Sequence, residues 1–179
     1  MKNLKDIIVE RLHINKDTGN HHYNYHPKDK DELEELIDKL IEERGYNANL
    51  NDIDTSEITD MSRLFYNSEF NGNISEWDVS NVEYMYNMFA YSKFNGDISN
   101  WDVSNVKYMD GMFKNSKFNG DISKWDVSNV KYMNFMFYYS QFTCENGDIS
   151  NWDVSNVKNM SFMFNCTHLY KNPPKWYKK

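Results

Sequence analysis

Hydrophobic residues recur along most of this chain with a period of 24 residues. The string WDVSNV begins at Trp77 and returns unchanged at Trp101, Trp125 and Trp152. The last step is 27 residues long because residues 143–145 are inserted, and we expect this insertion to lie in a loop. A fixed period of this length is typical of repeat proteins, in which each unit buries its apolar side chains against its neighbours.

Each repeat contains two shorter periods, which predict a strand followed by a helix. Ile74, Trp77 and Val79 have the spacing of a short strand, with the last two side chains on one face. Between residues 82 and 89, apolar side chains recur every three or four positions, as on one face of a helix, and Ser80 is placed to cap its N-terminus. The predicted fold class is therefore α/β, a leucine-rich-repeat-like solenoid of about five 24-residue strand-helix coils.

The pattern divides the chain into four parts. They are an N-terminal amphipathic or flexible segment at 1–18, a linker and N-terminal capping helix at 19–49, the repeat solenoid at 50–168, and a C-terminal cap with a basic tail at 169–179. The capping helix is predicted over 28–44, between Pro27 and Gly45, with acidic residues in its first turn. Because an open-ended stack exposes its core at both ends, we expect both terminal parts to cover apolar side chains.

The distribution of charge limits the classes of partner. The chain has 27 acidic and 20 basic residues and a net charge of -7, and its last 15 residues carry four lysines and no acid. The acidic repeats argue against binding to nucleic acid, which needs a basic stripe. The first residues lack the apolar core of a signal peptide and no long apolar run follows. We expect no membrane insertion and a cytoplasmic or virion-associated location, without support for surface display.

The sequence contains none of the common catalytic motifs. It has no phosphate-binding glycine loop, no G-x-S-x-G and no H-E-x-x-H. Cys144 and Cys166 form no disulfide framework, and the acidic neighbour of Cys144 disfavours a reactive thiol. His21, His22 and His26 have no cysteine or carboxylate at ligand spacing. We therefore predict a protein that is not an enzyme, with no catalytic residue, no cofactor and no metal site.

One candidate interaction surface is a column of carboxylates, one from each WDVSNV string. Its members are Asp78, Asp102, Asp126 and Asp153. Like charges on neighbouring coils repel one another unless hydrogen bonds or a cation compensate them. Each aspartate either accepts amide hydrogen bonds in a turn, or the column forms a groove for calcium or a basic peptide.

A second candidate surface lies where the repeats differ from one another. Phe135 and Phe162 occupy a position that is Asn or Gly in the two preceding repeats, and Tyr138 and Tyr139 follow nearby. Tyrosine and phenylalanine are favoured anchors of protein interfaces. These residues either form an exposed aromatic patch near the inserted loop or pack between coils and under the C-terminal segment.

The string FNGDISNWDVSNVKYMDGMF at residues 94–113 resembles the BspA-like leucine-rich repeats of mycoplasma surface lipoproteins and of many gut bacterial and phage proteins. The resemblance covers residues 50–164 and implies a leucine-rich-repeat solenoid with a role in adhesion or protein recognition. The start of the chain is also similar to leaders of proteins from phages of gut Bacteroidetes, which suggests a phage-encoded member.

The predicted function is therefore a non-catalytic protein–protein recognition module for adhesion or for binding a host or partner protein. The alternative is a structural or virion-associated phage protein that is attached through residues 1–18. In that role, the repeat array would stack with copies of itself or with a capsid component.

Overall fold

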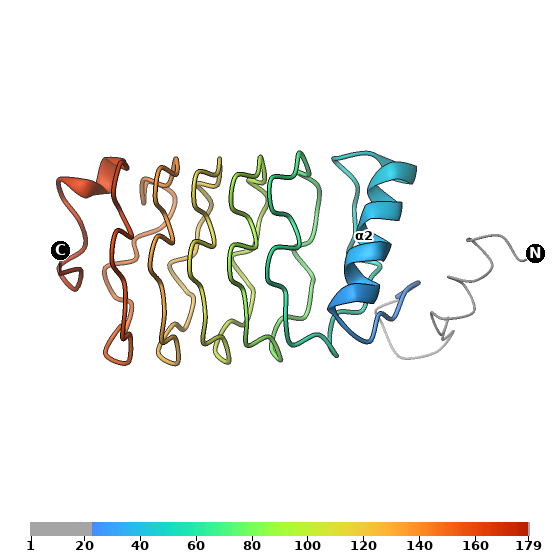
Figure 1. The fold of residues 1–179 in the computed structure, drawn as a ribbon, viewed down its shortest axis with the longest axis horizontal. Coiled ribbons are helices and arrows are strands. Elements are labelled where there is room, and N and C mark those ends of the chain that lie inside the picture. The colour runs from blue at the N-terminus through green and yellow to red at the C-terminus, as the bar shows by residue number, and fades with distance from the viewer. Residues whose placement is uncertain (1–22, 179) are drawn as a thin grey trace, which may run out of the picture.

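The structure is a computed structural model that describes residues 23–178. Figure 1 shows a row of similar coils that lie side by side, with the helix α2 across one end and the C-terminus at the other. The predicted segment 1–18 and the histidines His21 and His22 lie outside the described residues. The buried apolar side chains of α2 and of the coils form one continuous core.

The helix expected from the sequence is α2, Lys30–Arg44. Its N-terminus is capped by Asp29, whose carboxylate accepts a hydrogen bond from the Glu32 amide at 3.0 Å. Its C-terminus ends at Gly45, which has a φ of 87° and therefore suits a residue without a Cβ atom. The buried face of α2 packs on the core and consists of Leu33, Leu36, Ile37 and Leu40. The helix thus covers the apolar side chains that the first coil would otherwise expose.

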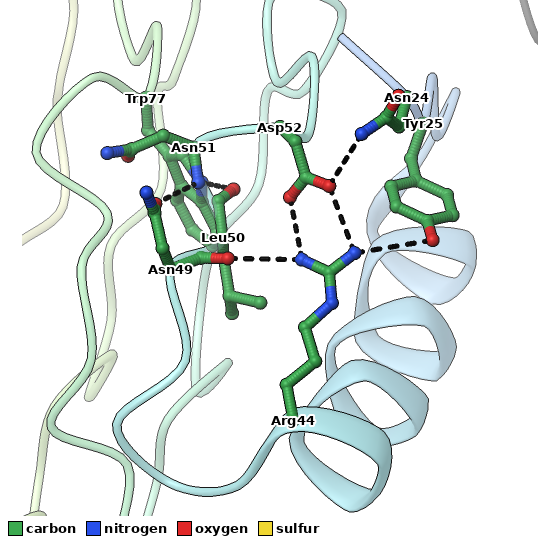
Figure 2. A network of polar contacts seen from close by, with 8 residues as sticks. All are labelled: Asn24, Tyr25, Arg44, Asn49, Leu50, Asn51, Asp52 and Trp77. Atoms are coloured by element: carbon green, nitrogen blue, oxygen red, sulfur yellow. Dashed lines mark hydrogen bonds and ion pairs between the residues drawn. The ribbon is translucent and has the colours of Figure 1, made fainter.

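A polar network fastens the end of α2 to the first coil (Figure 2). The Arg44 guanidinium donates to both carboxylate oxygens of Asp52 at 3.0 Å, and also to the Asn49 carbonyl and the Tyr25 hydroxyl. Asn24 donates a further hydrogen bond to Asp52 at 2.9 Å. Burial raises the pKa of Asp52, but the hydrogen bonds from Arg44 and Asn24 outweigh it, so this pKa lies below its usual value.

The prediction of strand-helix coils is wrong. Within residues 23–178, the only helical segments are α2 and the short 3-10 helix η1, His168–Tyr170, and no β-strand is formed. Parallel β-type pairing of the backbone between coils is instead limited to isolated bridges. The main column of bridges runs through Asp60, Tyr84, Tyr108, Tyr132 and Asn159. This column lies in the part of each repeat that was expected to be helical, so the α/β solenoid of the sequence analysis is not the fold.

The segment expected to be a helix is a series of turns because its backbone N–H groups alternate between two kinds of acceptor. The amides of Met85 and Asn87 donate to carbonyls of the next coil, at 2.9 Å each. The amides of Met88 and Ala90 donate to carbonyls three residues earlier in their own coil. A helix would direct every amide to the fourth preceding residue. The apolar residues of this segment are therefore buried as predicted, but on turns.

Left-handed backbone conformations allow this alternation. Two positions in each coil, four residues apart, have positive φ, as at Asn87 (51°) and Tyr91 (60°). The same two positions recur at Arg63 and Asn67 in the first coil. A right-handed helix cannot pass through such residues. Asparagine adopts this conformation more readily than most residues, which explains its frequency here.

The string WDVSNV forms turns and contacts between coils rather than a strand. Asp78 accepts hydrogen bonds from the Ser80 amide and hydroxyl, so Ser80 is not a helix cap. The Asn105 side chain donates to the Ser80 carbonyl of the preceding coil at 2.7 Å. The Trp101 indole donates to the Ile74 carbonyl of the preceding coil at 3.2 Å.

The core consists of ladders of identical side chains, as the repeat predicts. The rings of Trp77 and Trp101 stack with centroids 6.5 Å apart and an interplanar angle of 1°. Phe94 and Phe118 stack in the same way at 6.4 Å. Trp77, Val79 and Val82 are buried, so the prediction that the tryptophan and both valines of the string face the core is confirmed for this repeat. Each coil therefore depends on its neighbours for burial.

The C-terminal segment covers part of the last coil. Trp176 extends the tryptophan ladder, because its ring stacks on Trp152 at 6.1 Å and its indole donates to the Ile149 carbonyl at 2.9 Å. The buried Tyr177 ring packs edge-on against Phe164 at 5.0 Å. This contact closes the half of the last coil that contains its tryptophan and Phe164.

Candidate functional site

The aspartate column lies on the surface, and each carboxylate is engaged in a turn. Asp78, Asp102, Asp126 and Asp153 are exposed, and each accepts a hydrogen bond of 3.0–3.1 Å from the amide two residues later. These hydrogen bonds from serine hold the pKa values of Asp126 and Asp153 below their usual range. The hydrogen bonds that the turn interpretation of the column requires are therefore present in the structure.

A second column of turn aspartates accompanies the first. Asp97, Asp121 and Asp148 accept hydrogen bonds from the amides of the serines two residues later, and these bonds lower the pKa values of all three. Within residues 23–178, no three His, Cys, Asp or Glu side chains gather in a way that would hold a metal ion. His26, the one described member of the histidine cluster, contacts Asp54 at 3.0 Å. Both columns are thus explained by turn formation.

The late aromatic residues form a cluster on the last two coils. We call Phe135, Tyr138, Tyr139 and Phe162 the aromatic cluster. The Phe135 ring stacks on Phe162 at 5.2 Å with an interplanar angle of 9°, and it meets Tyr138 edge-on at 5.5 Å. Tyr138 in turn contacts Tyr139 at 4.8 Å. The structure therefore brings together all four of the aromatic residues that the sequence singled out.

The aromatic cluster is exposed as well as packed between coils. Phe162 retains 52% of its accessible surface and Tyr139 retains 55%, whereas Phe135 and Tyr138 are half-buried. The alternative in which the C-terminal segment covers the cluster does not apply to these two exposed rings. Exposed aromatic rings that touch one another form the apolar type of patch from which interface anchors are drawn.

The two phenylalanines occupy unfavourable backbone positions. Phe135 and Phe162 each have a φ of 59°, in the left-handed region. The equivalent residues of the two preceding coils are Asn87 and Gly111, which adopt this conformation with less strain, whereas the first coil has Arg63. A bulky residue held there costs on the order of 1–3 kcal/mol. The cluster therefore combines backbone strain with apolar exposure, and neither stabilises the fold.

Lys114 lies at the edge of the cluster. The Lys114 ammonium is 5.6 Å from the ring centroids of Tyr91 and Phe135, and 5.8 Å from that of Tyr138. Cation–π contacts of this kind contribute about 0.5–1 kcal/mol at exposed sites. The lysine thereby links the cluster to the two coils before it.

The inserted loop remains attached to the preceding coil. The Thr143 amide donates to the Asn119 side chain at 2.8 Å, and Asn146 donates to the Asn119 carbonyl at 2.5 Å. Burial raises the pKa of the Cys144 thiol, which disfavours the reactive thiolate form. The loop therefore accommodates three extra residues without breaking the contact between coils.

The repeats themselves identify the family. The family model described as "Mycoplasma protein of unknown function, DUF285" matches residues 33–146 and again residues 114–179. The chain belongs to the DUF285 family. Neither the search of curated proteins nor the search of solved structures gives a match for this DUF285 chain. The family is described as of unknown function, so the function of this DUF285 protein has to be argued from its surface.

Two features of this DUF285 chain were missed by the sequence analysis. One is the asparagine of WDVSNV, whose side chain joins each coil to the one before, as Asn129 does with Ser104 at 2.7 Å. Its unchanged place in every string was the available signal. The other is the open backbone edge of the last coil, which no residue type marks.

Over residues 23–178, no helix is long and apolar enough to span a membrane.

Proposed function

We propose that this protein is a non-catalytic recognition module that binds a partner protein through the aromatic cluster. The proposal extends to this chain the adhesion or recognition role that the resemblance to BspA-like repeats implies. The aspartate columns have a smaller part in it, because their carboxylates are already engaged in turns.

The observation that carries the proposal is the left-handed conformation of Phe135 and Phe162. Each ring stands where the second and third coils have Asn87 and Gly111, which the backbone favours, and the Phe162 ring remains half exposed to water. Strained residues persist where the strain serves a function. A stacked pair of exposed phenylalanines with two tyrosines has the composition of an interface anchor.

The test uses the residue that the repeat itself places at this position. Phe135→Asn and Phe162→Asn should leave the melting temperature unchanged or slightly raised, because asparagine relieves the backbone strain and offsets the lost ring stacking. The double variant should lose partner binding. The measurement compares proteins captured from cell extract by the immobilised wild type and by the variant, followed by calorimetric titration of any captured protein in purified form.

Tyr86→Asn is the matched control, since it removes an exposed tyrosine outside the cluster and should not affect binding. The proposal fails if the double variant binds the purified partner as tightly as the wild type does. A large loss of stability in the double variant would show instead that the cluster has a packing role.

The alternative, a structural role through stacking of copies, makes a different prediction. Size-exclusion chromatography with light scattering should then find a stable oligomer, whereas a recognition module should elute as a monomer. Dissociation of an oligomer by the asparagine variants would assign the cluster to self-association.

A further inference from the structure

The ladder of backbone hydrogen bonds between coils ends abruptly at the last coil. In each earlier coil, four alternate amides donate to carbonyls of the next coil, as Met133, Phe135, Phe137 and Tyr139 do. The equivalent amides of the last coil belong to Met160, Phe162, Phe164 and Cys166. Tyr177 packs against Phe164 and covers this position, with ring centroids 5.0 Å apart. Within the described chain, the other three amides have no acceptor.

A carbonyl acceptor is also left open on the same edge. The carbonyls of Glu83, Lys107 and Lys131 each accept two amides from the coil that follows. The equivalent carbonyl is that of Lys158, to which no amide of residues 23–178 donates. The edge therefore presents the Lys158 carbonyl and then the Met160 and Phe162 amides. In the other coils, this arrangement receives an extended stretch of about four residues.

A groove runs along this edge and has the size of a short peptide. It has a volume of about 460 Å³. Its lining includes the edge residues 158–162 together with Tyr170, Tyr177 and Lys178. The lining therefore combines the residues of the open edge with aromatic side chains and lysines. An edge of this kind is where extended peptides add to a sheet in many recognition domains.

The charge and the rings around the groove define the ligand. Residues 154–179 contain five lysines and no acidic residue, in contrast to the acidic coils before them. Lys158 and Lys178 line the groove itself. The Phe162 ring stacks on Phe135 on one side, and 52% of its surface remains accessible. A ligand that matches these features is extended, carries negative charge and has an aromatic side chain.

We propose that the C-terminal edge binds an extended acidic peptide segment of another protein as an additional rung of the stack. The peptide carbonyls accept hydrogen bonds from the Met160 and Phe162 amides, and a peptide amide donates to the Lys158 carbonyl. Its acidic side chains pair with Lys158 and Lys178, and its aromatic ring continues the stack on Phe162. This proposal and the proposed function both involve Phe162, but this one rests on the unpaired backbone amides and the Lys158 carbonyl of the last coil.

The experiment measures fluorescence anisotropy with the labelled peptide Asp-Glu-Tyr-Glu-Phe-Glu and the full-length protein. A second peptide has the same sequence with alternate backbone amides N-methylated, and a third has both aromatic residues replaced by serine. We expect the first peptide to bind and the other two to bind at least tenfold more weakly. N-methylation leaves the charge unchanged, but it removes the peptide N–H that donates to the Lys158 carbonyl, and its methyl groups keep the peptide backbone from approaching the Met160 and Phe162 amides.

Protein variants separate the edge from general attraction between charges. Lys158→Glu combined with Lys178→Glu should weaken binding of the first peptide at least tenfold. The matched control is Lys124→Glu, an exposed lysine away from the groove, which should leave binding unchanged. Equal binding of the N-methylated peptide, or equal loss in the control, would overturn the proposal.

Further variants distinguish failure of this proposal from failure of the aromatic cluster. Tyr139→Ser changes the cluster away from the groove lining, so it should retain the peptide and weaken capture of the cluster's partner. The double charge reversal should have the opposite pattern. If the charge reversal instead dissociates an oligomer and no peptide binds, a second copy of the chain occupies the edge and the peptide proposal is wrong.

Discussion

The two ends of the stack are closed in different ways. At the first coil, α2 covers the core with four buried side chains, and Arg44 and Asp52 fasten it to the coil at 3.0 Å. At the last coil, Trp176 and Tyr177 cover only one half, and the backbone from 158 to 162 keeps its open edge. One end is sealed by the helix α2, whereas the other is only partly covered, by the C-terminal segment that contains Trp176 and Tyr177.

This difference indicates which end is available for recognition. The sealed end buries the apolar face of α2, whereas exposed aromatic surface and amides without an acceptor in the described chain lie at the other end. The open end has both, together with the two phenylalanines in left-handed conformations and the lysines of the tail. Edges that natural proteins leave unprotected invite pairing with another chain. We therefore place both proposed binding surfaces at the C-terminal end.

The largest loss of stability is expected from a substitution that removes part of the buried face of α2 at the sealed end. Leu40→Ala removes a fully buried side chain of α2 and should lower the free energy of unfolding by about 2–5 kcal/mol. Urea denaturation followed by circular dichroism measures this change. Glu43→Ala, on the exposed face of α2, is the control and should change the free energy by less than about 0.5 kcal/mol. Equal effects of the two variants would mean that α2 does not seal the core.

A smaller and more local effect is expected at the other end. Trp176→Ala removes a half-buried ring and should lower the free energy of unfolding by about 1–3 kcal/mol. Hydrogen exchange should speed up at the hydrogen-bonded amides of the last coil, such as Met163 and Asn165, and remain unchanged near Met85, because each coil contacts only its neighbours. Faster exchange throughout the stack would contradict the view that the C-terminal end is covered independently.

The smallest effect concerns the clamp on α2 and depends on pH. Asp52→Asn should lower the free energy of unfolding by about 1 kcal/mol at pH 7. The folded-state pKa of Asp52 lies below its ordinary value, so its contribution is complete above that ordinary value and is lost as the pH falls through the folded-state pKa. Wild type and variant should therefore converge in acid. Denaturation curves from pH 7 to pH 2.5 measure this, and a constant difference would exclude the ion pair as its cause.

Burial could be predicted from the sequence more reliably than backbone conformation. The spacing of Trp77, Val79 and Met85 identified which side chains face the core, because a 24-residue period fixes the register whatever the local structure. The same spacing of three to four residues arises in a helix and in the alternating turns observed here. Only the positive φ values of Asn87 and its equivalents separate the two, and asparagine alone was too weak a signal.

The candidate site could be predicted where residue type carried the information. Phe135 and Phe162 were found because they depart from their own repeat, and the structure brings their rings together. Their strain and the open edge at Lys158 depend on backbone geometry, which no single residue type reveals. The aspartates had two interpretations because the same repeated aspartate is compatible with a carboxylate that accepts hydrogen bonds in a turn and with one that lines a binding groove.

The side-chain hydrogen bonds between coils run from each coil to the one synthesised before it. The Asn105 amide and the Trp101 indole both donate to carbonyls of the coil before, which the ribosome has already released when they emerge. Each coil can therefore settle on a finished template during synthesis, starting from α2. Each finished coil in turn presents a row of backbone amides that the carbonyls of the next coil engage, as the Met85 and Asn87 amides show.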